Sequence, residues 1–341
     1  MKIVIDIGGC DNPHKMIAGA IAAAKLHPDY TMVLVGDAEL IKKCSGSGMP
    51  SNVVAEHAPD VITNEDVPTH AIRQKPDSSL VKAFSVLNSN DDAIGIVSGG
   101  STGAVLTGAT LLVGRIPGVH RPVLTSLMPT SVLGKAVCIA DCGANVDSKP
   151  EFLAQFAVMG AVYVRAMFGI ENPVVSLLSV GTEDKKGDER TKAAFPLLKE
   201  LPINFVGNME ARDALTGNYD VVVTDGFSGN VLLKSTEGTA KMVVGKLKEA
   251  IMSSTRAKIG ALFMKKALNS FKAAMDYHSY GGGAFLGVKK LVVKMHGSVN
   301  EVSMKASISN IIKMHENNIL ENIRNGISAA VEKPVGDGAQ A

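Results

Sequence analysis

Short β-rich runs alternate with longer segments of helical periodicity through most of the chain, and this alternation limits the folds that the sequence can adopt. The β-rich runs occupy Lys2–Asp6, Thr31–Gly36, Ile94–Ser98, Ala136–Asp141, Val174–Val180, Ile203–Val206 and Asp220–Thr224. The helical segments between them include Lys15–Leu26, Thr102–Val113, Pro150–Phe168 and Glu189–Lys199. Such an order is typical of strand-helix-strand units in which the strands are parallel.

Two of the runs, Ile94–Val97 and Val221–Val223, are apolar without alternation. A strand that is buried on both faces has this pattern, because helices then cover both sides of the sheet. The sequence therefore predicts an α/β fold with a doubly wound, mostly parallel sheet. We expect residues 1–333 to form a single large domain and residues 334–341 to be a disordered tail.

The charge balance and the cysteine spacing argue against a nucleic-acid-binding or a metal-binding protein. The 35 basic and 33 acidic residues nearly cancel and aromatic residues make up 4%, so we expect no nucleic-acid partner. The four cysteines have no zinc-ligand spacing, and we expect no metal and no cofactor. The chain begins directly with a strand pattern instead of a secretory leader, so a cytoplasmic location is expected.

Polar, glycine-containing turns follow four of the predicted strands. They are Ser98–Gly103, Asp141–Asp147, Gly181–Lys185 and Thr224–Asn230. Ligands of open α/β sheets bind at the carboxyl ends of the strands, so we expect these turns to converge on one crevice.

The first of these turns, Ser98-Gly-Gly-Ser-Thr-Gly103, precedes a predicted helix. Its glycines allow the backbone to approach a ligand, and free N–H groups at a helix start favour an anion. It matches neither the Walker loop nor the dinucleotide fingerprint, so the anion need not belong to a nucleotide. A plain strand-to-helix turn with a Ser or Thr cap is the alternative, as an Asx turn with a cap is for the Asp141 and Thr224 turns.

A basic, amphipathic segment extends from about Ser254 to Tyr280. The interpretation as one helix places Ile259, Leu262, Phe263, Phe271 and Met275 on one face, beside Lys258, Lys265, Lys266 and Lys272. One interpretation is a core or dimer helix with a solvated lysine face. The other is contact with an anionic membrane surface or an acidic partner. We expect this helical extension to span about residues 250–283.

These motifs together resemble those of the bacterial phosphate acyltransferases, which make acyl phosphate from acyl carrier protein thioesters for phospholipid synthesis. The resemblance covers Asp6 to about Asn300. It is carried by Arg73-x-Lys75-x-Asp77-Ser-Ser79, Gly100-x-Thr-Gly-Ala104, Val113-Gly-Arg-Ile116, Asp141-x-Gly-Ala-Asn-Val-Asp147 with Lys149-Pro-Glu151, Gln155-Phe-Ala-x-Met-Gly160, Gly181-Thr-Glu183, Asn204-Phe-x-Gly-Asn208 with Glu210, Thr224-Asp-Gly-Phe-x-Gly-Asn230 and His296-Gly-Ser298. The chain departs from the family in Asp6-Ile-Gly-Gly-Cys-Asp11, where the family usually has Asp-Ala-Met-Gly-Gly-Asp.

The resemblance implies a homodimer with an isocitrate-dehydrogenase-like fold that works at the cytoplasmic membrane face. Its acyl-phosphate product would pass to a membrane glycerol-3-phosphate acyltransferase. This context favours a membrane role for the basic segment.

With this reaction in view, the sequence yields a set of candidate site residues. Phosphate is assigned to Ser98, Gly100, Ser101, Thr102 and Gly103, with Lys149 or Lys185 compensating its charge. Asn145, Asn208 and Asn230 are candidates for oxyanion or pantetheine contacts, and His296 is a candidate proton donor to the thiolate or a structural hydrogen-bonding residue. Substrate contacts are assigned to Arg73, Lys75, Ser79, Asp147, Thr182, Glu210 and Asp225.

Two other functions fit parts of the sequence. The fold class also suits an NAD-dependent dehydrogenase, although a nucleotide loop and clustered metal-binding aspartates are missing from the sequence. A non-catalytic scaffold at the membrane surface would dimerise and bind lipid without phosphate-dependent turnover.

Overall fold

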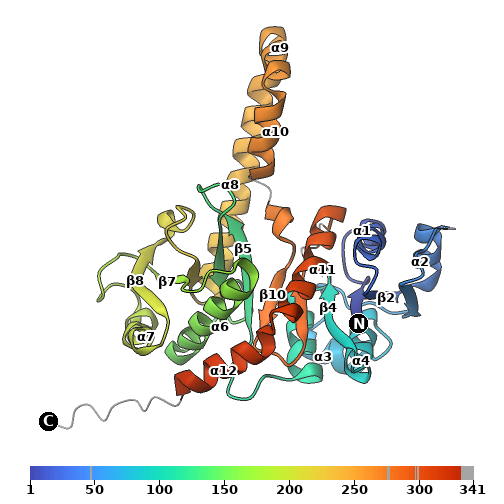
Figure 1. The fold of residues 1–341 in the computed structure, drawn as a ribbon, viewed down its shortest axis with the longest axis horizontal. Coiled ribbons are helices and arrows are strands. Elements are labelled where there is room, and N and C mark those ends of the chain that lie inside the picture. The colour runs from blue at the N-terminus through green and yellow to red at the C-terminus, as the bar shows by residue number, and fades with distance from the viewer. Residues whose placement is uncertain (47, 275–276, 296, 298, 332–341) are drawn as a thin grey trace.

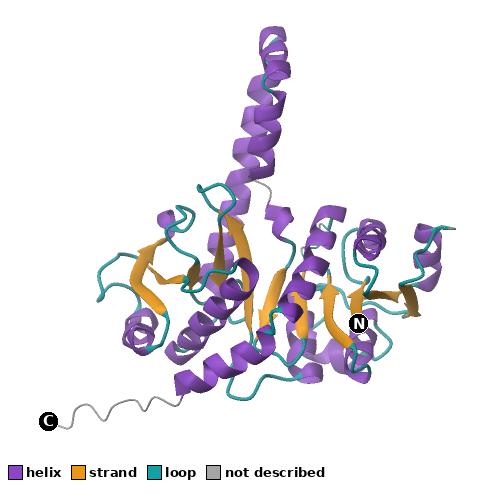
Figure 2. Cartoon of the chain, in the orientation of Figure 1, coloured by secondary structure: helices purple, strands orange, loops and turns teal. Residues whose placement is uncertain are grey.

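The computed structural model describes residues 1–46, 48–274, 277–295, 297 and 299–331. Its strands form one continuous 11-stranded sheet in the order β3-β2-β1-β4-β11-β10-β5-β6-β9-β7-β8 (Figures 1 and 2). The strands are β1 (Lys2–Asp6), β2 (Thr31–Gly36), β3 (Val53–His57), β4 (Ala93–Ser98), β5 (Val123–Pro129), β6 (Ala136–Ala140), β7 (Val174–Ser179), β8 (Asn204–Glu210), β9 (Val221–Val223), β10 (Gly283–Leu286) and β11 (Leu291–Lys294).

Most neighbouring strands are parallel, which confirms the predicted fold class. The exceptions lie in the middle of the sheet, where β10 is antiparallel to both β11 and β5, and β5 is antiparallel to β6. The sequence analysis missed β3, β5, β10 and β11. β10 and β11 have only four residues each, and β3 is exposed over most of its length. None of these three strands therefore gives a strong periodic signal.

Helices cover both faces of the sheet, as the apolar strands predicted. One face carries α1 (Pro13–Leu26), α2 (Ala38–Ser45), α6 (Pro150–Phe168), α7 (Glu189–Glu200), α11 (Glu301–Glu316) and α12 (Ile319–Val331). The other carries α3 (Pro68–Gln74), α4 (Ser79–Ser89), α5 (Thr102–Gly108) and the start of α8 (Gly226–Met252).

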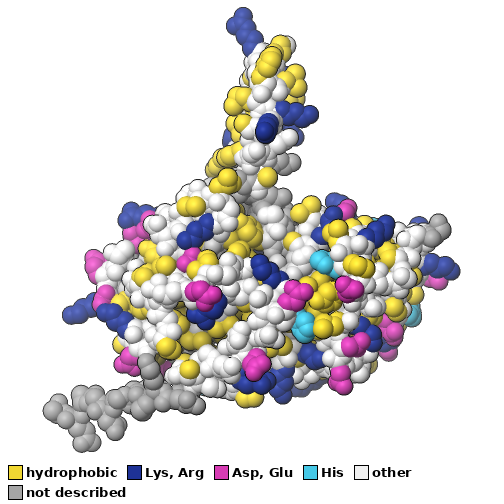
Figure 3. Space-filling model, in the orientation of Figure 1, with side chains coloured by type: hydrophobic (Ala, Val, Ile, Leu, Met, Phe, Trp, Pro, Cys, Tyr) yellow, Lys and Arg dark blue, Asp and Glu magenta, His cyan; other side chains and the backbone are white. Residues whose placement is uncertain are grey.

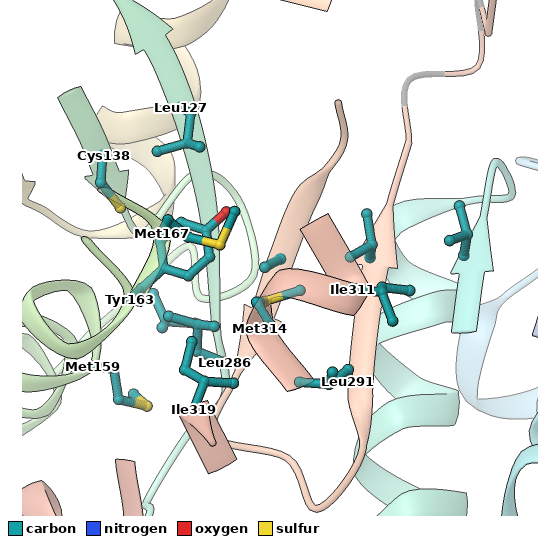
Figure 4. Packing of buried hydrophobic residues seen from close by; sticks show 14 of the residues in the cluster. Leu127, Cys138, Met159, Tyr163, Met167, Leu286, Leu291, Ile311, Met314 and Ile319 are labelled. Carbon is teal, nitrogen blue, oxygen red and sulfur yellow. The ribbon is translucent and has the colours of Figure 1, made fainter. Parts of the chain in front are cut away.

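A hydrophobic core lies on each face of the sheet, and successive residues of a strand pack alternately into the two cores. In β1, Ile3 and Ile5 pack into the core that contains α1 and α6, whereas Val4 packs into the core that contains α4. Figure 4 shows part of the first core, with Tyr163 of α6 near Leu286 of β10. Ile3, Val4 and Ile5 are all fully buried. Because side chains alternate between the two faces along a strand, the strand register decides which of them contact the helices on each face.

Helix α6 has the length and apolar composition of a membrane-spanning segment. It is the only described helix that meets that test, and 67% of its most apolar window is buried inside the protein. Phe156 and Met159 are 0% exposed. The apolar surface of α6 is therefore covered by the rest of the fold.

A helical projection stands away from the sheet (Figure 1). It consists of the outer part of α8 together with α9 (Thr255–Phe263) and α10 (Lys265–Ala274). The prediction of one helix from Ser254 onward was wrong, because the chain leaves helical geometry at Met264, with φ −89° and ψ 5°. Met275 and the predicted tail lie outside the described residues, and the side chain of Lys272 is not described.

Candidate active site

A cavity of about 440 Å³ opens at the carboxyl ends of β4, β6 and β11, and we call it the central cavity. Its lining comes from three of the four predicted turns and from β5, β10 and β11. The lining includes Gly99, Gly100, Ser101, Thr102, Leu124, Thr125, Cys142, Gly143, Gly226, Phe227, Asn230, Lys234, Gly283 and Lys294.

The fourth turn, Gly181–Lys185, does not reach the central cavity, so the expectation of one common crevice was wrong for it. β9 lies between β6 and β7, which moves the loop after β7 farther along the sheet edge. That loop instead adjoins a separate cavity of about 270 Å³, the side cavity, whose lining includes Leu178, Val180 and Arg190.

The turn after β4 is held in place by a hydrogen bond to a buried carboxylate. Ser98 Oγ donates to Asp6 Oδ2 at 2.6 Å and accepts from Gly100 N at 3.1 Å. Both side chains are at most 1% exposed. The Ser98 hydroxyl is therefore directed into the protein, and the residues presented to the cavity are those from Gly99 to Thr102.

Close packing explains the glycines of this turn. A Cβ on Gly99 would lie 2.6 Å from Cys10 Cβ, and a Cβ on Gly9 would lie 3.0 Å from Gly100 Cα. Larger residues would separate the loops after β1 and β4. Burial raises the pKa of Asp6 to about 6, against the lowering effect of its hydrogen bonds.

Two lysines lie in the wall of the central cavity. Lys294 ends β11 next to Ser98 in the parallel register, and Lys234 lies on α8. Burial, and then the positive charge of Lys234, lower the pKa of Lys294 to about 8. Lys234 Nζ forms an ion pair with Glu237 Oε2 at 2.9 Å. The cavity thus has cationic groups beside a glycine-rich turn.

The sequence analysis missed Lys294 because it missed the strand that carries it. The available signal was the apolar run Leu291–Val293 followed directly by a lysine, which is the same pattern of a polar residue at a strand end. The sequence analysis assigned no role to Lys234.

The turn after β6 is organised around the Asp141 carboxylate, which is 0% exposed. Its oxygens accept from the backbone N–H groups of Leu124, Gly143, Ala144 and Asn145, at 2.6 to 3.2 Å. Asn145 Nδ2 donates to Asp141 Oδ2 at 2.9 Å and to Pro122 O at 2.8 Å. Both amide hydrogens of Asn145 are thus used within the protein, which shapes the turn.

Cys142 lies beside Asp141 and lines the cavity. Burial, and then the Asp141 carboxylate, raise the pKa of the Cys142 thiol well above its ordinary value. The thiol is therefore protonated near neutral pH and is a poor nucleophile.

The start of α8 locks onto the Asp141 turn. Gly226 N donates to Asn145 O at 2.8 Å. Asp225 caps the helix by accepting from the N–H groups of Phe227 and Ser228, and its other oxygen pairs with Arg190 Nη2 at 2.9 Å. Asp225 is therefore engaged within the protein, whereas Asn230 faces the cavity one turn along the helix.

The remaining candidate residues lie outside the central cavity. Asp147, Lys149, Thr182 and Lys185 are exposed. Arg73 is on α3, and Lys75 directly follows that helix and pairs with Asp66 at 2.9 Å. Asn208 and Glu210 are on the edge strand β8, Ser79 is buried at the start of α4, and Gly103 follows Thr102 in α5. His296 lies outside the described residues. Within the described part of the chain, no group of three or more His, Cys, Asp or Glu side chains is placed to hold a metal ion.

Comparison with solved structures shows a fold like that of phosphotransacetylases. The phosphotransacetylase of Streptococcus pyogenes aligns with a TM-score of 0.55 and 17% identity, over 96% of this chain and 94% of that one. A branched-chain phosphotransacylase of Enterococcus faecalis aligns with a TM-score of 0.53 and 16% identity, over 92% and 99%. At these identities the likeness establishes the fold.

Sequence comparison places the chain in a family. Residues 1–322 match the family described as "Fatty acid synthesis protein". The phosphate acyltransferase of Brevibacillus brevis is 44% identical over 329 residues, 96% of this chain and 97% of the relative. That of Clostridium novyi is 44% identical over 332 residues, 96% and 98%. This chain therefore belongs to the fatty acid synthesis protein family and, within it, to the phosphate acyltransferases, which are acyl-transferring enzymes.

Proposed function

We propose that this acyltransferase moves an acyl group from acyl carrier protein to inorganic phosphate, releasing acyl phosphate and the free carrier thiol. The observation that carries the proposal is the placement of Lys234 and Lys294 beside the Gly99–Thr102 turn in one cavity. Lysine ammonium groups and free backbone N–H groups together suit a phosphate dianion.

The chemistry requires positioning more than acid or base groups. A phosphate oxygen attacks the thioester carbonyl, a C–O bond forms, and the C–S bond breaks as the sulfur leaves with its electron pair. A thiolate is a tolerable leaving group, with a pKa of about 8.5, and it takes a proton from solvent. The site must therefore hold phosphate against the carbonyl and stabilise the oxyanion of the tetrahedral intermediate.

Within this proposal, Ser101, Thr102 and the N–H groups at the start of α5 bind phosphate, and Lys294 and Lys234 compensate its charge. Asn230 donates its amide to the developing oxyanion. Asn145 acts through the Asp141 turn as a positioning residue.

The exposed basic residues suit an acidic protein partner. We assign Arg73, Lys149 and Lys185, which lie outside the central cavity, to contacts with acyl carrier protein. Such long-range charges mainly raise the association rate, and salt screens them.

The direct test is the release of free carrier thiol from palmitoyl carrier protein with and without inorganic phosphate. We expect release that depends on phosphate and one equivalent of acyl phosphate for each thiol. Thiol release at the same rate without phosphate would contradict acyl transfer to phosphate, and no release from any acyl donor would favour the scaffold hypothesis.

The pH profile of this reaction should report the Lys294 amine. Lys294 is cationic below its pKa of about 8 and loses its attraction for phosphate as the pH rises through that value. We expect kcat/KM for phosphate to fall above pH about 8, since this parameter reports ionisation in the free enzyme. Lys294→Arg should move the fall to higher pH. An alkaline limb that stays in place in Lys294→Arg would show that Lys294 is not the group responsible for it.

We also propose that the helical projection binds the cytoplasmic membrane surface of the cell, where a homodimer hands acyl phosphate to a membrane glycerol-3-phosphate acyltransferase. Leu262 and Phe263 are 71% and 88% exposed, and Lys258, Lys265 and Lys266 are exposed near them. Figure 3 shows apolar and basic side chains along the projection. Apolar residues that insert between lipids, with lysines over anionic headgroups, are the pattern of an interfacial helix.

Replacing both Leu262 and Phe263 by Asp should weaken binding to vesicles that contain anionic lipid by at least about tenfold, because apolar area is lost and negative charge is added. Vesicle co-sedimentation measures this. Leu133→Asp is the matched control, since Leu133 is 88% exposed on the sheet domain, and it should bind as wild type does. Equal loss in the control would indicate a charge effect of the whole surface.

A further inference from the structure

Another cavity shares part of its lining with the central cavity, and we call it the lateral cavity. Its volume is about 510 Å³, within the range of small-molecule sites. Gly9, Asp11 and Asn64 line both cavities. The lateral cavity lies at the carboxyl ends of β1, β2 and β3, and Gly9 is in the wall between it and the central cavity.

The inner wall of the lateral cavity is apolar. It includes Ile7 and Ala58, which are 3% and 2% exposed, together with Leu40, Pro59 and Val61. Val61, at 36% exposed, lies where the cavity meets solvent. A hydrocarbon placed here would leave water for a largely apolar surface.

Two of the polar side chains of the lateral cavity are engaged within the protein. Asp37 Oδ1 accepts from the N–H groups of Glu39 and Leu40 at the start of α2. Thr63 Oγ1 donates to Asp66 Oδ2 at 3.1 Å. The Ser79 hydroxyl oxygen is buried without a hydrogen-bond partner, and it packs against Gly8, where a Cβ would lie 2.0 Å from Ser79 Oγ. The amide-containing arm of the carrier would find few free hydrogen-bond partners here, and burying its unpaired amides would cost free energy.

Charge excludes a second anion from the lateral cavity. Asp11 and Asp37 are both carboxylates in its wall, and no lysine or arginine is among its described lining residues. An anionic occupant is therefore disfavoured here, unlike in the central cavity.

We propose that the lateral cavity holds the hydrocarbon tail of the acyl group during transfer. The inference rests on the proposed function, because that reaction places the thioester carbonyl in the central cavity. The two chains that leave the thioester then separate by polarity: the tail enters the lateral cavity, and the amide-containing arm of the carrier stays on the open side.

The test compares palmitoyl and butyryl carrier protein in variants that fill the lateral cavity. Val61→Trp and Leu40→Trp should lower kcat/KM for the palmitoyl donor by at least about tenfold, because each excluded methylene forfeits binding energy, while the butyryl donor changes by less than about threefold. Leu178→Trp, in the side cavity, is the control and should leave the ratio of the two donors unchanged. Thermal unfolding checks that each variant is folded.

A second measurement separates failure of this inference from failure of the proposed function. Displacement of the fluorescent fatty acid cis-parinaric acid reports tail binding without turnover. Weaker binding in Val61→Trp and Leu40→Trp, but not in Leu178→Trp, supports the lateral cavity even if no phosphate-dependent release is found. An unchanged palmitoyl-to-butyryl ratio, an equal loss with both donors, or length-selective loss in Leu178→Trp would each overturn the inference.

Discussion

Lys294→Met is expected to lower phosphate-dependent thiol release by about 100-fold or more. The substitution keeps an unbranched side chain of similar length but removes the ammonium group that lies partly buried beside the Gly99–Thr102 turn. Electrostatic stabilisation in a water-poor site has effects of this size on rate. Steady-state kinetics with varied phosphate would measure it, and the loss should appear in kcat/KM for phosphate.

Stability distinguishes this effect from misfolding. Burial makes the charged form of Lys294 unfavourable, as its lowered pKa indicates, so Met should leave the Tm unchanged or raise it. Lys313→Met is the matched control, because Lys313 is exposed on α11, outside the central cavity. A large loss in Lys185→Met together with normal turnover in Lys294→Met would move the phosphate cation to the loop after β7.

Gly229→Ala is expected to destabilise the fold by about 3 kcal/mol or more, with loss of activity at temperatures where the wild type is stable. A Cβ at this position would lie 1.8 Å from the carbonyl oxygen of Asp141. No side-chain rotation relieves a clash with backbone, so either α8 or the Asp141 turn must move. Urea or thermal unfolding measures the change.

The same helix offers an internal control. Gly238 also lies in α8, but a Cβ there would meet no atom within 4 Å. Gly238→Ala should therefore raise stability by about 0.5–1 kcal/mol, because alanine loses less backbone entropy in a helix. If the two substitutions had equal effects, helix propensity rather than contact with the Asp141 turn would be the cause.

Local periodic signals allowed the prediction of seven strands and four helices, namely β1, β2, β4, β6, β7, β8 and β9 with α1, α5, α6 and α7. The exposed edge strand β3 was missed. The Ile94–Val97 and Val221–Val223 runs indicated strands buried on both faces, and both lie in such positions. The centre of the sheet could not be predicted in this way. β10 depends on pairing with β5, which lies far away in the sequence, and four residues contain too little periodicity to indicate it.

In the candidate site, too, residues with a local sequence signal could be predicted, whereas residues placed by distant contacts could not. Four of the predicted residues line the central cavity: Gly100, Ser101, Thr102 and Asn230. They could be predicted because turns at strand ends have a recognisable composition. Lys294 did not stand out, because one lysine after a short apolar run has no distinctive signature. The engagement of Asn145 with Asp141 and Pro122 also depends on tertiary contacts that spacing alone does not specify.

The pairing of β4 with β11 has a consequence for synthesis on the ribosome. Gly95 lies opposite Leu291 in this pair, so the strand that supplies Lys294 joins the sheet only after nearly the whole chain has left the exit tunnel. Contacts between such distant segments form late, since closing a long loop precedes any gain from pairing. A nascent chain therefore carries the glycine-rich turn before Lys294 is in place, and the proposed phosphate site is complete only after β11 has paired with β4.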